Sequence, residues 1–440
     1  MPDGTAPYPH TEIRMERRSI PPRAFWLAIL LGLAVRVAIV SVVEYRIDTG
    51  DAAGYDQIAR NLVERGVFSL DSHPPFRPTL VRPPILPGVA AATYALFGHR
   101  LWPLQLLQVL VSMATALVLF GALRRAAPRL AWPAFLLLLV SPFDALYTGA
   151  LLAETITTFF VVSAVCLPLY GFRGSWLAAG ACAGAAALTR DVYVLLPLAM
   201  AGAVVLGRVA DAPLRRRVAH AGALLLGAVL VISPWTARNF HSSGAFVPVS
   251  KGVMGVTLWV GAWERNGDWQ GSGRPAFPPE AYRFGGRELV EESWGAPDRH
   301  RDTVFMRLAR EHYTRQPGAV LRAWAVRYPR MWVGTRFELF SFRPAALAHG
   351  QPLWYAVKAG LWALNLAVLG AALAGVLFLR RHPALLWIAA PVLYNALIYV
   401  PFHNTETRYS QPVYPLLLVF AAATVVALRD RVRGVRPAAH

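Results

Sequence analysis

Charged side chains are scarce in this sequence of 440 residues, and the scarcity limits the kind of protein that it can encode. Asp, Glu, Lys and Arg make up 16% of the residues, whereas soluble proteins carry about 25%. Hydrophobic residues make up 55%, and the mean hydropathy is +0.40. These values argue against a cytosolic enzyme or a disordered chain, and they favour a protein that crosses a membrane several times.

Cysteine and several catalytic motifs are scarce or missing as well. Cys166 and Cys182 both lie in apolar runs, where we expect small buried hydrophobic residues rather than a disulfide or a metal site. The sequence has no GxxxxGK(S/T) phosphate loop, which argues against ATP-driven transport. It has no HExxH motif, which argues against a zincin-type protease. The expected cytoplasmic loops are too short for a nucleotide-sugar domain, so a sugar substrate would have to arrive activated on a lipid.

The charge that is present is mostly positive, with 44 basic against 25 acidic residues and a net charge of +19. Such a balance can indicate nucleic-acid binding. Here, however, the basic residues form short clusters between apolar runs. Clusters in those positions orient membrane helices, so no nucleic acid is expected as a partner.

Ten apolar runs predict an all-α polytopic membrane protein. The first run would be about 28 Å long as a helix, close to the thickness of the hydrocarbon core. Basic residues precede it and no cleavage site follows, so we expect an uncleaved helix with a cytoplasmic N-terminus. The ten expected spans are residues 25–43, 101–123, 130–147, 151–170, 176–189, 192–206, 218–234, 354–379, 384–400 and 413–428.

This topology explains the positive charge, because every connection that it places in the cytoplasm is basic. It also places two long segments on the outer side. The expected domains are a cytoplasmic tail at 1–24, an N-terminal transmembrane module at 25–234 with its first outer loop at 44–100, a mixed extracytoplasmic domain at 235–353, C-terminal transmembrane helices at 354–428 and a cytoplasmic tail at 429–440.

The first outer loop contains two helical patterns. Residues 52–65 place Tyr55, Ile58 and Ala59 on one stripe and Asn61 off it, which predicts an amphipathic helix on the membrane surface. Residues 85–97 are apolar but too few to span a membrane comfortably, which predicts a second interfacial or re-entrant helix.

The unusual ionisable residues all fall at the outer ends of the expected spans. Charged groups at membrane level are costly and by default indicate a functional site. Arginine binds phosphate through a bidentate fork, and a carboxylate can act as a general base. The mixture therefore suits an anionic substrate together with a proton acceptor. The residues in question are Asp51, Arg82, Glu154, Arg190, Asp191, Arg238, Glu406 and Arg408.

Simpler explanations remain open for each of them. Asp51 could cap the helix that follows it, and Glu154 is favoured at a helix N-terminus by the helix dipole. The arginines could anchor lipid headgroups. His403 could be an ordinary loop residue. The tryptophans 259, 263 and 269 could be core or interface residues as readily as a platform for a sugar.

Six short motifs in order resemble the GT-C-type integral-membrane glycosyltransferases. The closest resemblance is to bacterial family 39-like members, which are related to protein O-mannosyltransferases and lipid A aminoarabinose transferases. The resemblance covers about residues 25–428. The motifs are Gly50-Asp51 with Tyr55 and Ile58 to Leu62, Arg82-Pro83-Pro84, Ala153-Glu154-Thr155, Leu188-Thr189-Arg190, Pro234 to Asn239, and Arg408-Tyr409 with Pro412.

The resemblance implies an inverting transfer of a sugar from a polyprenyl-phosphate donor to a glycan, lipid or protein acceptor. It implies that Asp51 is the general base and that Glu154 orients the acceptor or assists it. The implied substrate-binding residues are Tyr55, Arg82, Arg190, Arg238, Glu406, Arg408 and Tyr409.

The resemblance also implies a multi-pass protein of the cytoplasmic membrane whose active site faces the periplasm or the cell exterior. No cofactor follows from the sequence. Metal dependence varies within the family and no ligand set is evident, so a divalent cation is left open. Two other functions also stay open, namely a polysaccharide ligase or polymerase that uses lipid-diphosphate donors, and a lipid or solute transporter.

Overall fold

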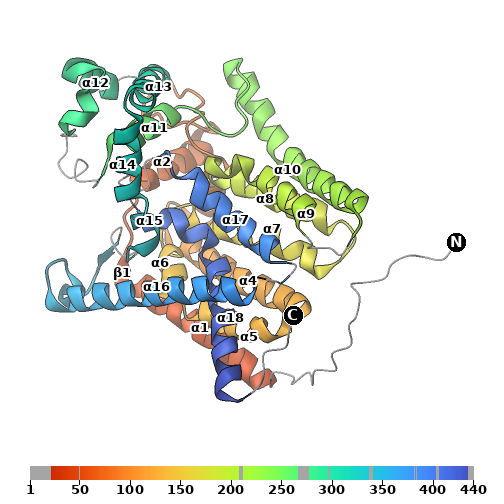
Figure 1. The fold of residues 1–440 in the computed structure, drawn as a ribbon. Coiled ribbons are helices and arrows are strands. Elements are labelled where there is room, and N and C mark those ends of the chain that lie inside the picture. Colours follow the sequence, from red (N-terminus) through yellow and green to blue (C-terminus); the bar gives the residue numbers. More distant parts are fainter. Residues whose placement is uncertain are drawn as a thin grey trace.

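The computed structural model describes residues 21–48, 50–207, 212–265, 277–295, 298–335, 340–380, 382, 384–402 and 406–434. Helices dominate this described part of the chain (Figure 1). The two strands found there have two residues each. Strand β1 (Val43–Glu44) pairs antiparallel with β2 (Ser341–Phe342), so the end of the first span is joined to a segment far along the chain. The all-α membrane fold expected from the sequence is confirmed.

Five helical segments in the described residues are long and apolar enough to cross a membrane. Each coincides with an expected span. They are α1 (Pro22–Val42), α4 (Trp102–Ala126), α10 (Leu214–Ser243), α16 (Pro352–Phe378) and the continuous segment Thr407–Val432, in which the 3-10 helix η6 (Thr407–Val413) leads into α18 (Tyr414–Val432).

The other five expected spans are shorter or interrupted helices. Proline at a new helix start, as at Pro142, removes a backbone donor and favours a break. The segments are α5 (Pro128–Leu139) with α6 (Pro142–Tyr147), α7 (Glu154–Cys166) with η1 (Leu167–Tyr170), α8 (Ser175–Thr189), η2 (Asp191–Leu195) with α9 (Leu196–Leu206), and α17 (Leu385–Ile398).

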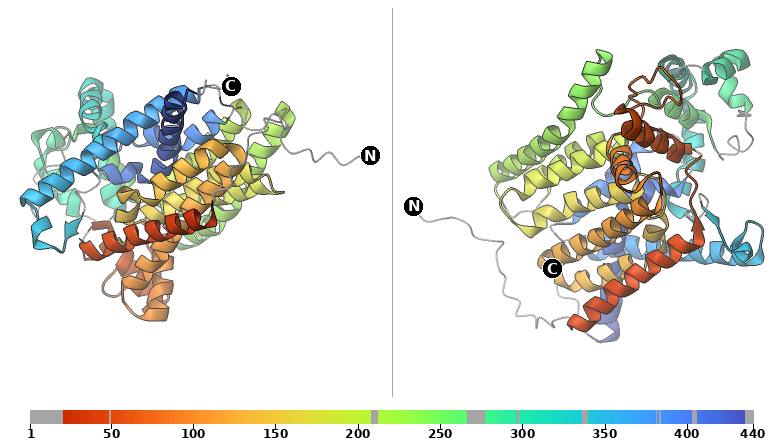
Figure 2. Two further views of the ribbon diagram at one scale, coloured as in Figure 1. Left: turned by 90° about the horizontal axis from the view of Figure 1, so that it is seen from below. Right: turned by 180° about the vertical axis from the view of Figure 1, so that it is seen from behind.

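Close packing of α8 against α10 depends on glycine. A Cβ added at Gly180 would lie 1.8 Å from the carbonyl oxygen of Leu224, and one added at Gly227 would lie 2.1 Å from that of Leu177. Small residues allow the backbones of membrane helices to approach in this way. Figure 2 shows the two helices side by side.

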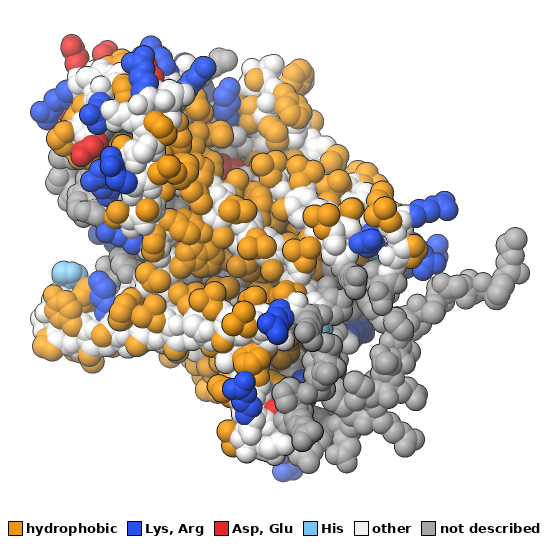
Figure 3. Space-filling model, in the orientation of Figure 1, with side chains coloured by type: hydrophobic (Ala, Val, Ile, Leu, Met, Phe, Trp, Pro, Cys, Tyr) orange, Lys and Arg blue, Asp and Glu red, His pale blue; other side chains and the backbone are white. Residues whose placement is uncertain are grey.

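The surface agrees with a membrane protein. Figure 3 shows hydrophobic side chains over a broad belt across one face, whereas basic side chains gather over α12 to α14 and at the edges. The beginning of α1 and the end of α18 lie at the bottom of Figure 1, whereas α2 of the first outer loop lies in its upper half.

The first outer loop contains both helices that the sequence predicts, α2 (Gly50–Arg65) and α3 (Ile85–Phe97). Tyr55, Ile58 and Ala59 are buried as expected, but they pack within the protein, where Tyr55 and Ala59 join a core with α3. Asn61, which the pattern placed off the stripe, is fully buried. Its side-chain amide donates to the carbonyl oxygens of Ser69 and Asp71, at 2.8 and 2.9 Å.

The outer domain was expected to be mixed, yet its described residues are mostly helical. Its core is aromatic, and Trp259 and Trp263 lie in it with Phe277 and Phe305. Those two tryptophans are therefore core residues rather than a sugar platform, whereas position 269 lies outside the described residues. The elements are α11 (Met254–Trp263), η4 (Pro279–Tyr282), α12 (Gly286–Gly295), α13 (Asp298–Arg315), α14 (Pro317–Arg327), α15 (Arg330–Val333), β2 and η5 (Ala345–Leu347).

A buried ion pair joins three helices, α1, α4 and α6. Arg36 of α1 contacts Asp144 of α6 at 2.8 Å, and their side chains are 0% and 4% exposed. The guanidinium also donates to Ser112 Oγ of α4 at 2.8 Å and to the carbonyl oxygen of Leu139 at 2.9 Å. No local pattern in the sequence indicates this pair, because Arg36 and Asp144 lie 108 positions apart.

Candidate active site

Asp51 lies between two arginines that come from distant parts of the chain. Its Oδ1 contacts Nη2 of Arg82 at 2.8 Å, and its Oδ2 contacts Nη1 of Arg408 at 3.0 Å. Arg82 precedes α3, and Arg408 belongs to η6. The side chain of Asp51 is 30% exposed, so the contact is sheltered but open to a substrate.

Asp51 stands in the first turn of α2, after Gly50, whose φ is +58°. Glycine adopts this left-handed conformation without a steric cost, and it lets the chain turn sharply into the helix. A carboxylate in the first turn is favoured by the helix dipole. Because α2 begins at Gly50, Asp51 lies inside the first turn rather than at the N-cap, and the helix dipole and the two arginines both favour its carboxylate form.

The surroundings of Asp51 set its protonation state. Burial acts to raise the pKa of its carboxyl group, but the charges of Arg408, Arg82 and Arg190 outweigh burial and hold the pKa below its ordinary value of 3.8. Burial likewise opposes the positive charge of Arg82, and the charge of Asp51 keeps the pKa of Arg82 above its ordinary value. Burial raises the pKa of Tyr55 to about 12. Asp51 is therefore a carboxylate at neutral pH, and in this ion-paired arrangement it is a weak base.

A second acid–arginine pair lies beside the first. Glu154, the first residue of α7, contacts Nη1 of Arg190 at 3.0 Å through its Oε1, and the two side chains are 2% and 13% exposed. Oε2 of Glu154 is buried without a hydrogen-bond partner among the described residues. A buried oxygen of this kind is costly, which indicates that a donor group of a ligand would be favoured there.

Tyr409 links the two pairs. The guanidinium of Arg190 and that of Arg408 each lie 5.0 Å from the centre of its ring. Nη2 of Arg408 also donates to the Tyr409 hydroxyl at 3.1 Å, and Nε of Arg408 contacts Oε2 of Glu406 at 2.6 Å. Arg82 lies over the ring of Tyr55 at 5.3 Å.

We call these residues the acid–arginine cluster, and their formal charges cancel. Three guanidinium groups face three carboxylates through ion pairs of 3.0 Å or less. An added phosphate anion would therefore leave the cluster with excess negative charge. The cluster consists of Asp51, Tyr55, Arg82, Glu154, Arg190, Glu406, Arg408 and Tyr409.

Arg238 lies apart from these contacts, although the sequence analysis placed it in the substrate site. Its Nη1 donates to the carbonyl oxygen of Thr79 at 2.9 Å. Its guanidinium stacks on Trp235 at 4.7 Å and on Phe68 at 5.2 Å. In this structure Arg238 therefore holds the loop between α2 and α3 against α10.

Two further candidates have other outcomes. Asp191 accepts a hydrogen bond from the Ser250 hydroxyl, so it joins η2 to the segment between α10 and α11. His403 lies outside the described residues. Among the residues that the structure describes, no group of three or more His, Cys, Asp or Glu side chains is placed to hold a metal ion.

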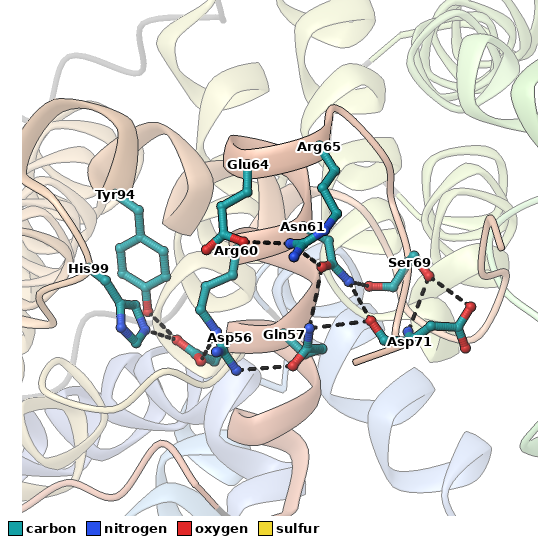
Figure 4. Close-up of polar contacts among 10 residues, drawn as sticks. All are labelled: Asp56, Gln57, Arg60, Asn61, Glu64, Arg65, Ser69, Asp71, Tyr94 and His99. Carbon is teal, nitrogen blue, oxygen red and sulfur yellow. Dashed lines mark hydrogen bonds and ion pairs between the residues drawn. The ribbon is translucent and has the colours of Figure 1, made fainter. Parts of the chain in front are cut away.

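Sequence reasoning missed a second carboxylate of α2, Asp56. It is 4% exposed and contacts Tyr94, His99 and Arg60 (Figure 4). A signal was present, because Asp56 lies four residues after Ala52 and three before Ala59, both of which are buried. This spacing places an acid on the buried face of the helix.

The comparisons with known proteins agree with this architecture. Residues 81–237 match the model of the family described as dolichyl-phosphate-mannose-protein mannosyltransferase. No curated protein matches the chain significantly.

Two solved structures of an oligosaccharyltransferase from Archaeoglobus fulgidus share the fold. AglB in complex with an inhibitory peptide and a dolichol-phosphate has a TM-score of 0.51 at 12% identity, and the match covers 94% of this chain and 51% of that one. The enzyme tethered with an acceptor peptide has a TM-score of 0.53 at 12% identity, with 93% and 50% covered. The chain thus spans about half the length of these structures.

ArnT from Cupriavidus metallidurans bound to undecaprenyl phosphate matches at 16% identity with a TM-score of 0.35, over 92% of this chain and 78% of that one. The family match over residues 81–237 and the fold shared with the archaeal structures agree with the resemblance inferred from the motifs.

Proposed function

We propose that this chain transfers a sugar from a polyprenyl-phosphate donor to an envelope acceptor. The premise is its resemblance to GT-C-type membrane proteins and to the protein mannosyltransferases. The acceptor is a glycan, a lipid or a protein. The single observation that carries the proposal is the contact of Asp51 with Arg82 and Arg408, which brings a proton acceptor and two phosphate-binding groups to one place.

The reaction is an inverting substitution at the anomeric carbon. The acceptor hydroxyl oxygen attacks that carbon, the bond to the phosphate oxygen breaks, and the phosphate leaves with the bonding electrons. Asp51 takes the hydroxyl proton, a step that contributes about 10²–10⁴-fold. The arginines stabilise the negative charge that develops on the leaving phosphate, and such stabilisation is often the largest catalytic effect.

The charge balance of the acid–arginine cluster links donor binding to this proton transfer. In the structure Asp51 is a weak base because Arg82 and Arg408 hold it as an anion. A donor phosphate competes for the same guanidinium groups and adds negative charge, and both effects raise the pKa of Asp51. Asp51 therefore becomes an effective base only when the donor is present.

Glu154 fits the role of orienting the acceptor. Its Oε1 is held by Arg190, whereas its buried Oε2 has no hydrogen-bond partner among the described residues. A hydroxyl or amine of the substrate would supply that partner. The ring of Tyr409 contacts the guanidinium groups of both Arg190 and Arg408.

The same proposal places the reaction at the outer face of the cytoplasmic membrane. Basic side chains hold the connections at the other ends of the helices. Arg125 donates to the carbonyl oxygen of Tyr170 at 2.9 Å, and Arg129 contacts Asp430 at 3.0 Å. Basic residues at this end favour a cytoplasmic position, which leaves the acid–arginine cluster toward the periplasm or exterior.

The decisive experiment compares two Asp→Asn variants in proteoliposomes. Asp51→Asn removes the base but keeps the size of the side chain, so transfer from a polyprenyl-monophosphate sugar should fall by about 10²–10⁴-fold. Asp48→Asn is the matched control, because Asp48 lies three residues earlier, is 64% exposed and contacts Arg46. It should transfer at the rate of the unmodified enzyme.

The donor in the assay separates the proposal from its main rival. Transfer from polyprenyl-monophosphate sugars and not from the diphosphate forms supports the proposal, whereas the reverse preference indicates a ligase or polymerase. Near-normal turnover by Asp51→Asn would remove Asp51 from the mechanism.

A further inference from the structure

Asp56 is the second acid of α2, and it is buried against α3 rather than in the acid–arginine cluster. Its Oδ1 accepts a hydrogen bond from the Tyr94 hydroxyl at 2.7 Å and contacts Nε2 of His99 at 2.7 Å. Its Oδ2 contacts Nε of Arg60 at 3.0 Å. Figure 4 shows these side chains converging on the carboxylate from α2, from α3 and from the segment after α3. Burying a carboxylate is costly unless it is paired, and both oxygens of Asp56 have polar partners.

The contacts continue across α2 to the loop that follows it. Nη2 of Arg60 donates to Oε1 of Gln57 at 3.0 Å, and Nε2 of Gln57 donates to Oδ1 of Asn61 at 3.3 Å. Asn61 in turn donates to the carbonyl oxygens of Ser69 and Asp71. Figure 4 shows this series as one polar network from His99 to Asp71. The network therefore fixes α2 on two sides.

The rotation of α2 about its axis decides where Asp51 points. Asp51 precedes Asp56 by five residues on the same helix, which separates them by about 7.5 Å along the axis and about 140° around it. Since side chains extend about 5–6 Å from the axis, a rotation of about 20° would move the tip of Asp51 by about 2 Å. A shift of that size would break its contacts of 2.8 and 3.0 Å with Arg82 and Arg408. A misplacement of about 1 Å can already cost 10²-fold in rate.

We propose that Asp56 is a positioning residue, which with Tyr94 and His99 fixes the rotation of α2 on α3 and so holds Asp51 between Arg82 and Arg408. The catalytic part of this inference rests on the proposed glycosyl transfer. The positioning part does not, because it concerns the geometry of α2 alone.

The test compares Asp56→Ala with Glu64→Ala in the full-length protein in proteoliposomes. Glu64 is an acid of the same helix, but it is 53% exposed and contacts its neighbour Arg65, so it is a matched control. Hydrogen exchange of the peptides within residues 50–65 should speed up about 10-fold or more in Asp56→Ala and stay unchanged in Glu64→Ala. Asp56→Asn keeps an acceptor for Tyr94 but loses the negative charge, so it should fall between them.

The kinetic test measures kcat per folded enzyme and the pH profile of kcat/KM, because a loss of folded protein would change neither. In Asp56→Ala, kcat per folded enzyme should fall about 10- to 100-fold, with a smaller change in KM for the donor. The acidic limb of kcat/KM should also move up toward pH 3.8, the ordinary pKa of an aspartate, because Asp51 would no longer be held between the two arginines.

The positioning role and the proposed function can fail independently of each other. If Asp56→Ala lowers only the thermal transition and leaves the exchange of α2, kcat per folded enzyme and the pH profile unchanged, the positioning role is wrong and Asp56 is simply structural. If the unmodified protein transfers no sugar, the proposed function fails, and the exchange experiment still decides whether Asp56 fixes α2.

Discussion

Two groups of acids and arginines lie in this molecule, and they differ in how completely their hydrogen bonds are satisfied. Arg36 and Asp144 are 0% and 4% exposed, and the guanidinium donates to Ser112 and to backbone carbonyl oxygens as well as to the acid. In the acid–arginine cluster Asp51 is 30% exposed, and the buried Oε2 of Glu154 has no hydrogen-bond partner among the described residues. Both groups pair arginine with carboxylate. A saturated pair holds helices together, whereas an unsaturated one leaves atoms for a substrate.

The largest expected effect tests the saturated pair. Asp144→Ala leaves Arg36 as a buried charge without its acid, and removing one partner of such a pair costs about 3–5 kcal/mol. The thermal transition should therefore fall sharply, while the protein that remains folded should transfer sugar at a normal rate. Fluorescence-monitored unfolding in detergent, together with activity per folded enzyme, measures both quantities.

The double variant Arg36→Met with Asp144→Ala sharpens this prediction. It removes both charges, so it should recover much of the stability lost in Asp144→Ala. A double variant that is less stable than Asp144→Ala alone would contradict a purely electrostatic cost.

The next largest effect tests the unsaturated cluster. Arg408→Gln removes a cation that contacts both Asp51 and Glu406. Loss of one charge-stabilising group costs about 10²–10³-fold in kcat, and we expect that loss with a small change in the thermal transition. Arg46→Gln is the control, because Arg46 is 60% exposed and contacts Asp48. Equal losses of stability in Arg408→Gln and Asp144→Ala would remove the distinction between the two groups.

Part of the fold and of the candidate site could be predicted from the sequence. The patterns in the first outer loop gave α3 its observed bounds and α2 its end, because both are local helices with clear apolar faces. The position of Asp51, Arg82, Glu154 and Arg408 at one end of the spans followed from counting helices. Their contacts required the fold, since Asp51 and Arg408 are far apart in the sequence.

The contacts that the sequence could not predict depend on packing between distant segments. Arg36 pairs with Asp144 across 108 positions, so its partner has no local signal. Arg238 has the same residue type and position as the phosphate-binding candidates, but the neighbouring rings of Trp235 and Phe68 hold it elsewhere. The helix α8 is shorter than a typical membrane span, and its close packing on α10 through Gly180 and Gly227 supports it.

A moderate effect is expected in the pH dependence of the reaction. In the free enzyme Arg408 and Arg82 hold the pKa of Asp51 below its ordinary value, so the carboxylate persists as the pH falls. Bound donor phosphate should raise that pKa. The acidic limb of kcat, which reports the enzyme–substrate complex, should therefore lie at higher pH than the limb of kcat/KM, which reports the free enzyme.

Arg82→Gln should narrow the gap between the two limbs. The variant removes one of the charges that lower the pKa of Asp51 in the free enzyme, so the acidic limb of kcat/KM moves to higher pH. Coincident limbs in the unmodified enzyme would contradict the idea that the donor activates Asp51.

The smallest expected effect concerns Arg238. A variant at this position tests whether Arg238 has a structural role, like Arg36, or binds the donor phosphate, as proposed for Arg82. Arg238→Ala removes one hydrogen bond to Thr79 and the stacking on Trp235 and Phe68, which together contribute about 1–2 kcal/mol. Hydrogen exchange in residues 66–84 should increase, because this loop loses its attachment to α10. Affinity for undecaprenyl phosphate should change by less than about 3-fold, whereas Arg82→Ala should lower it by about 10-fold or more, since loss of a charge-assisted phosphate contact costs about 1.5–3 kcal/mol. Equal losses of affinity in the two variants would place Arg238 in the donor site after all, and the loop that it holds would then have to move when the donor binds.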